Sequence, residues 1–186
     1  LAVVAASLDG DEDKRAQVEA LSREIRGKHA LFHAHLELKE VFSLERPAPL
    51  DEGRNNGAAY ADAFVGNPPF MGAAFITERL GEGYVEWLQC VAPGTVGKFD
   101  LCALFFRRAA SLLGAHGAIG FIATNTIAQG DTRATGLQRL VVHDGFTIHD
   151  AVRSMRWPGD SAVSVSVVLL AKGRVRDGMG ELRLDD

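Results

Sequence analysis

Two consecutive prolines that directly follow an apolar run constrain this chain more than any other feature. Residues 61–66 read Ala-Asp-Ala-Phe-Val-Gly, and Asn67, Pro68, Pro69 and Phe70 come immediately after them. Proline restricts φ and has no backbone N–H, so a helix or a central strand cannot continue through this point. The pattern predicts a short buried strand over residues 61–66 and, beyond its end, a stiff backbone whose carbonyl groups have fixed directions.

The spacing of hydrophobic residues predicts the other elements. An early helix carries Val18, Leu21 and Ile25 on one stripe and is expected to end at Gly27. Further strands are expected at residues 118–123, 146–152 and 163–170, and further helices at 84–91, 99–113 and 132–142. Residues 72–83 are expected to form a loop, with room for a short helix at 73–80. The alternation of strand and helix predicts an α/β fold.

The helix at residues 99–113 is the clearest of these elements. Leu101, Leu104 and Phe105 fall on one stripe at 3.6 residues per turn, so they are predicted to face the core. Gly114 is a natural stop for this helix. The strand that follows is continuously apolar, which is typical of a strand covered on both faces in a parallel sheet.

Charge and composition exclude some classes of protein. The net charge of −4 argues against an autonomous DNA-binding module, which is usually basic, and fits a catalytic core that borrows affinity from another domain. No apolar run reaches the roughly 18 residues of a membrane span, and the N-terminus is a poor signal peptide. Cys90 and Cys102 form no CxxC pair and are expected to be reduced thiols, so we expect a cytoplasmic location. The chain also lacks an initiator Met, which suggests a fragment.

Residues 67–70 supply the groups that methylation of an exocyclic amine requires. The lone pair of such an amine is delocalised into the ring, and two acceptors aimed at its N–H groups favour the tetrahedral geometry that frees it. The Asn67 side-chain oxygen can be one acceptor and the Pro68 carbonyl the other, while Pro69 stiffens the backbone. Phe70 can stack on the base. The alternative is a proline turn that caps the strand, with Asn67 satisfying local backbone groups.

Several segments resemble the γ-type N6-adenine DNA methyltransferases. Residues 62–70 resemble motif IV, and this motif is the specific element of the resemblance. The resemblance extends over residues 60–173, through segments similar to motifs V to VIII at 98–113, 117–122, 124–125 and 156–168. The Trp-Pro-Gly sequence at residues 157–159 is similar to that of the large single-chain restriction-modification methylases.

The resemblance implies a partial Rossmann-like class I methyltransferase fold, preceded by an N-terminal helix. The chain would hold the C-terminal half of the sheet, mostly parallel with one antiparallel strand. The implied reaction transfers methyl from S-adenosylmethionine to a flipped adenine of DNA, in a bacterial restriction-modification or phage-defence system. Asn67, Pro68, Pro69 and Phe70 would be the catalytic segment, with Phe70 stacked on the base and Trp157 as the second wall of its pocket.

The Gly-rich cofactor loop of this family has no counterpart upstream of Asn67. The resemblance therefore implies that Asn67 makes only a weak cofactor contact and that the rest of the cofactor site lies outside this chain. We expect an N-terminal helical segment at 1–58, the catalytic core at 59–173, and at 174–186 the start of a linker to a missing recognition domain. The chain alone is expected to be inactive.

Other functions stay open from the sequence. RNA and protein-glutamine methyltransferases share the Asn-Pro-Pro motif, but they usually carry Tyr in place of Phe70 and lack an insertion like residues 72–97. A non-catalytic or split subunit is the other alternative, supported by the missing cofactor loop.

His29 and His33 have helical metal-ligand spacing, but Gly27 interrupts the pattern and no metal is expected. Arg153 and Arg156 flank Trp157 and suit either solvent or phosphate.

Overall fold

The computed structural model describes residues 12–28, 38–42, 60–157 and 163–173. The chain forms two compact units, Leu1–Glu40 and Val41–Asp186. The first unit contains helix α2 (Glu12–Lys28), whose first turn carries two acidic residues, where negative charge interacts favourably with the helix dipole. This helix confirms the predicted one and ends one residue after Gly27. His29 and His33 lie outside the described residues.

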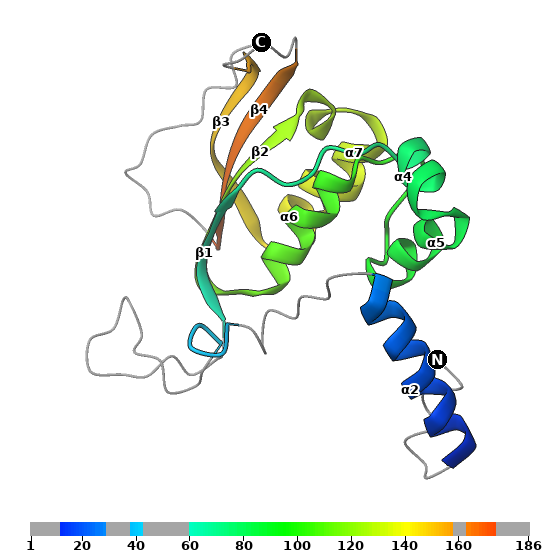
Figure 1. The fold of residues 1–186 in the computed structure, drawn as a ribbon. Coiled ribbons are helices and arrows are strands. Elements are labelled where there is room, and N and C mark those ends of the chain that lie inside the picture. Colours follow the sequence, from blue (N-terminus) through cyan, green and yellow to red (C-terminus); the bar gives the residue numbers. More distant parts are fainter. Residues whose placement is uncertain (1–11, 29–37, 43–59, 158–162, 174–186) are drawn as a thin grey trace, which may run out of the picture. The chain divides into compact units, whose positions relative to one another are not determined.

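The second unit is built on a four-stranded sheet with the order β1-β2-β4-β3 (Figure 1). Its strands are β1 (Ala61–Gly66), β2 (Leu113–Thr124), β3 (Phe146–Arg156) and β4 (Ser164–Lys172). Strand β1 pairs with β2 in parallel, whereas β4 pairs antiparallel with both β2 and β3. Within this sheet β4 alone therefore runs against the others, which confirms the predicted sheet with one antiparallel strand.

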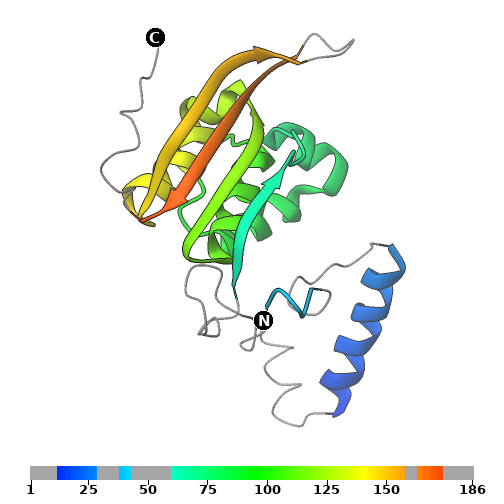
Figure 2. The same cartoon turned by 90° about the vertical axis from the view of Figure 1, so that its left-hand side faces the viewer.

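Helices connect the parallel strands. Between β1 and β2 lie α4 (Ala73–Leu80), α5 (Glu82–Val91) and α6 (Leu101–Ser111). Between β2 and β3 lie the 3-10 helix η1 (Asn125–Ala128), then α7 (Gly130–Arg133), the π-helical turn η2 (Ala134–Gln138) and α8 (Arg139–Val142). Figure 2 shows the sheet in front of these helices, so both connections cover the same face.

The core lies between this face of the sheet and α6. Ile119, Phe121 and Ala123 alternate along β2 and are buried. Phe106 on α6 is fully buried and meets the Phe121 ring edge-on, with 5.0 Å between the ring centroids. These contacts bury large apolar surfaces, which is the main favourable contribution to folding.

The opposite face of the sheet is exposed, which corrects the prediction that β1 is buried and that β2 is covered on both faces. Only Ala61 of β1 is buried, and the Val65 side chain is 87% exposed. Ala118 on β2 is exposed as well. Successive side chains of a strand point to opposite faces of the sheet, so each continuous apolar run places residues on both faces. The helices cover only one of these faces.

The buried stripe of α6 also differs from the prediction. Cys102, Phe106 and Ala109 are buried, whereas Phe105 is 42% exposed. Of the predicted stripe, Leu104 is buried as predicted and Leu101 is half-buried, so Phe105 is the residue that departs from the prediction. The helix also ends at Ser111 rather than at Gly114, which lies within β2.

Leu104 belongs to a separate apolar cluster with Ile76, Leu88 and Phe99, which joins α4 and α5 to the start of α6. This cluster explains why residues 72–97 fold as two helices rather than as a loop. None of the helices in the described part of the chain is long and apolar enough to cross a membrane.

Candidate active site at the carboxyl end of β1

Residues 67–70 leave the sheet at the carboxyl end of β1, as the sequence predicts. Pro68 is buried and anchors the segment, Phe70 is half-buried, and Asn67 and Pro69 are exposed. Ligands of open α/β sheets bind beyond the carboxyl ends of the strands. The Asn67 amide is thus accessible to a ligand, while the backbone that carries it is held by a buried proline.

The chain beyond Phe70 pairs with the entry to α6. The Leu101 N–H donates to the Met71 carbonyl at 2.8 Å, and the Ala73 N–H donates to the Phe99 carbonyl at 2.9 Å. These two bonds form a short antiparallel bridge between Gly72 and Asp100, just after residues 67–70. The segment is therefore bounded by β1 at one end and by this bridge at the other.

Asp100 ties the same exit to the N-terminus of α6. Its side chain is the N-cap of the helix: Oδ1 accepts the Cys102 N–H at 3.0 Å and the Met71 N–H at 3.2 Å. Its own N–H donates to Thr132 Oγ1 at 3.0 Å. Asp100 is only 8% exposed. Asp100 is not among the site residues predicted from the sequence, although an Asp directly before an apolar helix is an N-cap signal.

The Cys102 thiol lies behind this N-cap and is fully buried. Burial, followed by the negative charge of Asp100, raises the pKa of Cys102 to about 12. A thiol with this pKa stays protonated near neutral pH and is a poor nucleophile. Cys90, by contrast, is exposed on α5.

The carboxyl end of β2 adds polar groups to the same edge of the sheet. The Thr124 and Thr126 hydroxyls lie 2.6 Å apart. Asn125 contacts two serines on the neighbouring strands: it donates to Ser154 Oγ at 3.1 Å and accepts from Ser166 Oγ at 2.9 Å. Asn125 lies in the segment that resembles motif VII, but its contacts could not be predicted from the sequence because both of its partners are distant in the chain.

Trp157 follows the last residue of β3 and is half-buried. Its backbone N–H donates to the Val163 carbonyl at 3.0 Å. Strands β1 and β3 are the two edges of the sheet, so three interstrand steps, or roughly 14 Å, separate their ends. The structure thus places Phe70 and Trp157 at one end of the sheet but does not bring their rings together. Arg153 and Arg156 are exposed nearby.

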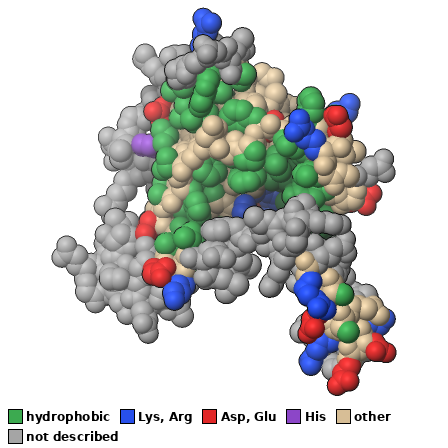
Figure 3. Space-filling model, viewed as in Figure 1, with side chains coloured by type: hydrophobic (Ala, Val, Ile, Leu, Met, Phe, Trp, Pro, Cys, Tyr) green, Lys and Arg blue, Asp and Glu red, His purple; other side chains and the backbone are tan. Residues whose placement is uncertain are grey.

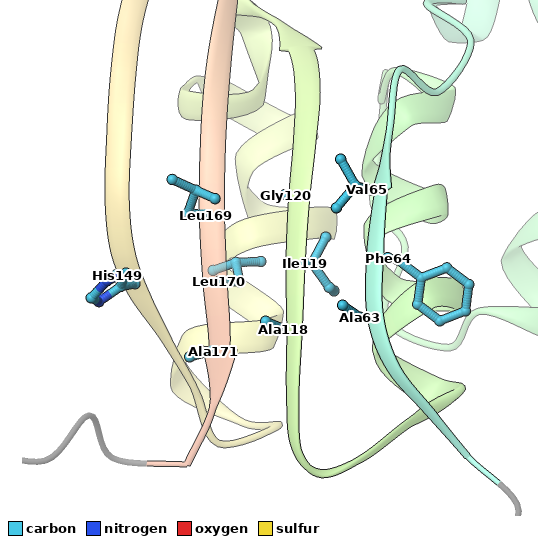
Figure 4. A pocket seen from close by; sticks show the side chains of 10 residues that line it. All are labelled: Ala63, Phe64, Val65, Ala118, Ile119, Gly120, His149, Leu169, Leu170 and Ala171. Carbon is cyan, nitrogen blue, oxygen red and sulfur yellow. The ribbon is translucent and has the colours of Figure 1, made fainter. Parts of the chain in front are cut away.

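Two concave surfaces lie away from these residues. A cavity of about 150 Å³ lies on the open face of the sheet, between Val65, Gly120, His149 and Leu169 (Figure 4). Its lining is almost entirely apolar, and the acceptor groups of residues 67–70 are not among it. It therefore does not offer the chemistry expected of a base pocket.

An open groove of about 880 Å³ lies between α5 and α6. Hydrophobic side chains gather over these helices (Figure 3), including Trp87 and Phe105. Arg107 in this groove donates to the Pro93 carbonyl at 2.7 Å and to Thr95 Oγ1 at 3.2 Å. Burial lowers the pKa of Arg107. Through these hydrogen bonds its guanidinium binds the loop after α5, so it is not free for a ligand.

The described residues contain no cluster of side chains that could hold a metal ion.

Residues 35–177 match the family model of the MmeI DNA-methyltransferase domain. A structure of the type IIL restriction-modification enzyme MmeI in complex with DNA is 26% identical, with a TM-score of 0.51, covering 61% of this chain and 16% of that one. A putative class I S-adenosylmethionine-dependent methyltransferase from Listeria monocytogenes is 12% identical, with a TM-score of 0.46, covering 71% of this chain and 38% of that one. A DrdV–DNA complex is 19% identical, with a TM-score of 0.43, covering 62% and 14%.

No curated protein sequence matches the chain. The chain spans only a small part of the length of the solved structures that it resembles. The family match nevertheless includes every strand of the sheet and residues 67–70. The α/β sheet with one antiparallel strand, the conformation of residues 67–70 and this match lead to one conclusion: the chain belongs to the MmeI DNA-methyltransferase domain family.

Proposed function

We propose that this chain forms the target-base half of a DNA adenine N6-methyltransferase that uses S-adenosylmethionine, in a restriction-modification or phage-defence system. The observation that carries the proposal is the exposed Asn67 amide at the carboxyl end of β1, on a backbone anchored by the buried Pro68. Family membership supports methyl transfer to DNA. The solved MmeI relative is a complex with DNA, which supports DNA as the substrate.

In the proposed reaction the chain orients the amine. The Asn67 side-chain oxygen and the Pro68 carbonyl accept hydrogen bonds from the two N–H groups of adenine N6. The amine nitrogen forms a bond to the methyl carbon as the carbon–sulfur bond breaks, and one N–H proton then leaves to solvent. Phe70 stacks on one face of the base, and Trp157 approaches from the other side of the sheet end. An enzyme of this kind must flip the base out of the duplex to reach it.

S-adenosylmethionine supplies an electrophilic methyl group on a positively charged sulfur. The described residues fit only the reactive end of this cofactor, because Asn67 is the one exposed amide of the candidate segment. The remaining contacts would come from outside this chain, as the sequence predicts. The proposed transfer runs directly from sulfur to nitrogen, so it needs no covalent intermediate and no catalytic cysteine.

Methylation by the intact enzyme, measured with labelled cofactor on DNA, RNA and protein, tests this proposal. Asn67→Ala should lower turnover on DNA about a hundredfold or more, as loss of one preorganised polar group does in other enzymes. Its affinity for DNA should remain nearly intact. Gln89→Ala, at an exposed position of α5, is the matched control. Unchanged turnover would refute the role of Asn67, and methylation of RNA or protein alone would refute the substrate.

A split or non-catalytic subunit is the second candidate, and the exposed apolar face of the sheet favours it. Val65 is 87% exposed on edge strand β1, which is unusual for a β-branched residue in a strand. A split subunit should co-purify with a second polypeptide that carries the Gly-rich cofactor loop. Isothermal titration of this chain with S-adenosylmethionine separates the cases further: micromolar affinity would show that the cofactor site lies within the chain.

A further inference from the structure

Asn125 connects three strands at the end of the sheet where the candidate site lies. It is the first residue of η1 and directly follows β2. Its Nδ2 donates to Ser154 Oγ on β3 at 3.1 Å, and its Oδ1 accepts from Ser166 Oγ on β4 at 2.9 Å. Because β4 lies between β2 and β3, the Asn125 amide reaches across the middle strand to the edge strand.

One of the two serine hydroxyls has few other partners, whereas Ser154 is exposed to water. Ser166 is only 3% exposed, so its hydroxyl has little access to water. A buried hydroxyl without a partner is costly, and Asn125 supplies that partner. The amide therefore has a structural use for both its donor and its acceptor, which leaves little of it for a direct contact with a base.

Ser154 has an unusual backbone conformation. Its φ of 53° is the only positive value among the described residues other than glycine. A side chain in this region clashes with its own backbone, and the conformation persists only where neighbouring contacts hold it. The hydrogen bond from Asn125 is such a contact.

Ser154 lies in a β-bulge. The register of β3 against β4 shifts between Val152 and Met155, so that Arg153 and Ser154 both lie opposite Ser166. A bulge bends its strand, increases its twist, and commonly redirects side chains next to active sites. The residues that follow this bulge lead directly to Trp157. The direction of Trp157 therefore depends on the bulge.

We propose that Asn125 is a positioning residue that holds the Ser154 bulge and thereby aims Trp157 toward the flipped base. The role of Trp157 as the second wall of the base pocket rests on the proposed function. The claim that Asn125 fixes the position of the end of β3 depends only on its two hydrogen bonds and on the bulge. Asn125 touches neither the base nor the reacting atoms.

Trp157 itself provides the readout. The chain has two tryptophans, and Trp87→Phe, at a half-exposed position of α5, leaves Trp157 as the single one. In this background, acrylamide quenching and fluorescence anisotropy report the exposure and mobility of Trp157. Near-isosteric Asn125→Leu removes both hydrogen bonds and should raise the population of the displaced strand end about tenfold, because each neutral bond changes such an equilibrium severalfold. Quenching should rise and anisotropy should fall.

Two variants act as controls. Asn125→Asp keeps two acceptor oxygens to which both serine hydroxyls can donate, so the signals of Trp157 should stay near those of the parent. Gln138→Leu makes a similar amide-to-leucine change at an exposed position of η2 and should leave Trp157 unchanged. If Asn125→Leu does not fold, Ser154→Ala removes the hydroxyl that accepts from Asn125 while keeping a side chain at the positive φ, and it should also release Trp157.

The outcomes separate this inference from the proposed function. If Trp157 is equally quenched and equally ordered in Asn125→Leu, or in Ser154→Ala where the first does not fold, the positioning role is refuted. If Trp157 is released, the intact enzyme carrying Asn125→Leu should show a raised KM for DNA that Asn125→Asp restores. A released Trp157 with unchanged methylation would instead refute the base-stacking role of Trp157 and keep the positioning role.

Discussion

Asp100→Ala should destabilise the fold, because Asp100 is buried between α6 and the exit of residues 67–70. The substitution removes the N-cap of α6 and, with the same oxygen, the acceptor for the Met71 N–H at the exit of residues 67–70. The variant would weaken the link between α6 and the candidate segment without altering any residue of that segment, because only the two backbone hydrogen bonds of the bridge would remain.

The size of the effect follows from these two contacts. Replacing an Asp N-cap by Ala costs about 1 kcal/mol, and a hydrogen bond to a charged group contributes about 1.5–3 kcal/mol. Met71 is half-buried, so water can replace part of the second contact. The expected loss is about 2–3 kcal/mol, a large fraction of the roughly 5–15 kcal/mol that stabilises a typical domain.

Urea unfolding followed by circular dichroism measures this loss as a lower midpoint at constant slope. Asp100→Asn is the matched control, since its amide oxygen can accept both bonds without the charge and should lose about 1 kcal/mol or less. Hydrogen exchange at Met71 and Cys102 should speed up in the Ala variant only. An Ala variant that unfolds within 0.5 kcal/mol of the parent, about the effect of a neutral surface substitution, would refute the energetic role of Asp100.

Other substitutions test the core and the open face of the sheet. Phe106→Ala should cost about 3–5 kcal/mol because the ring is fully buried against Phe121, whereas Val65→Thr should stay within about 0.5 kcal/mol because Val65 is exposed; comparable losses in urea unfolding would contradict the assigned faces. The pKa of Cys102, raised from 9.0 to about 12, means that the neutral thiol stabilises the fold fully below pH 9. That contribution is lost as pH rises from about 9 toward 12, with a slope of up to about 1.4 kcal/mol per pH unit. Cys102→Ala should show a shallower decline in unfolding free energy over this range, and parallel curves would contradict the assignment.

Local sequence determined the order of elements and the place of the candidate segment. Strand β1 ends at Gly66, as predicted, because Pro68 and Pro69 cannot extend a ladder. The helix at Ala73–Leu80 also agrees with the expected range. These features depend on backbone restrictions and on periodicity over a few residues, which a sequence displays directly.

Burial could not be predicted in the same way. Periodicity shows which side chains share a face, but it does not show whether another element covers that face. Val65 and Phe105 belong to apolar runs and yet are exposed, because the described helices pack on one face of the sheet and α6 approaches it through Cys102, Phe106 and Ala109.

The polar contacts around the candidate site were decided by the tertiary structure alone. Asn125 lies 29 residues from Ser154 and 41 from Ser166, and Asp100 lies 29 residues from Met71. The Asn125 pairs meet only after the strand order β1-β2-β4-β3 places β4 between β2 and β3, and the Asp100 pair meets only when α6 begins beside the end of β1. The chain's own sequence thus determined which residues stand at the end of β1, because proline stereochemistry is local. The sheet determined what holds the neighbouring strand ends, because a hydrogen bond needs two groups within about 3 Å and only folding brings distant ones together.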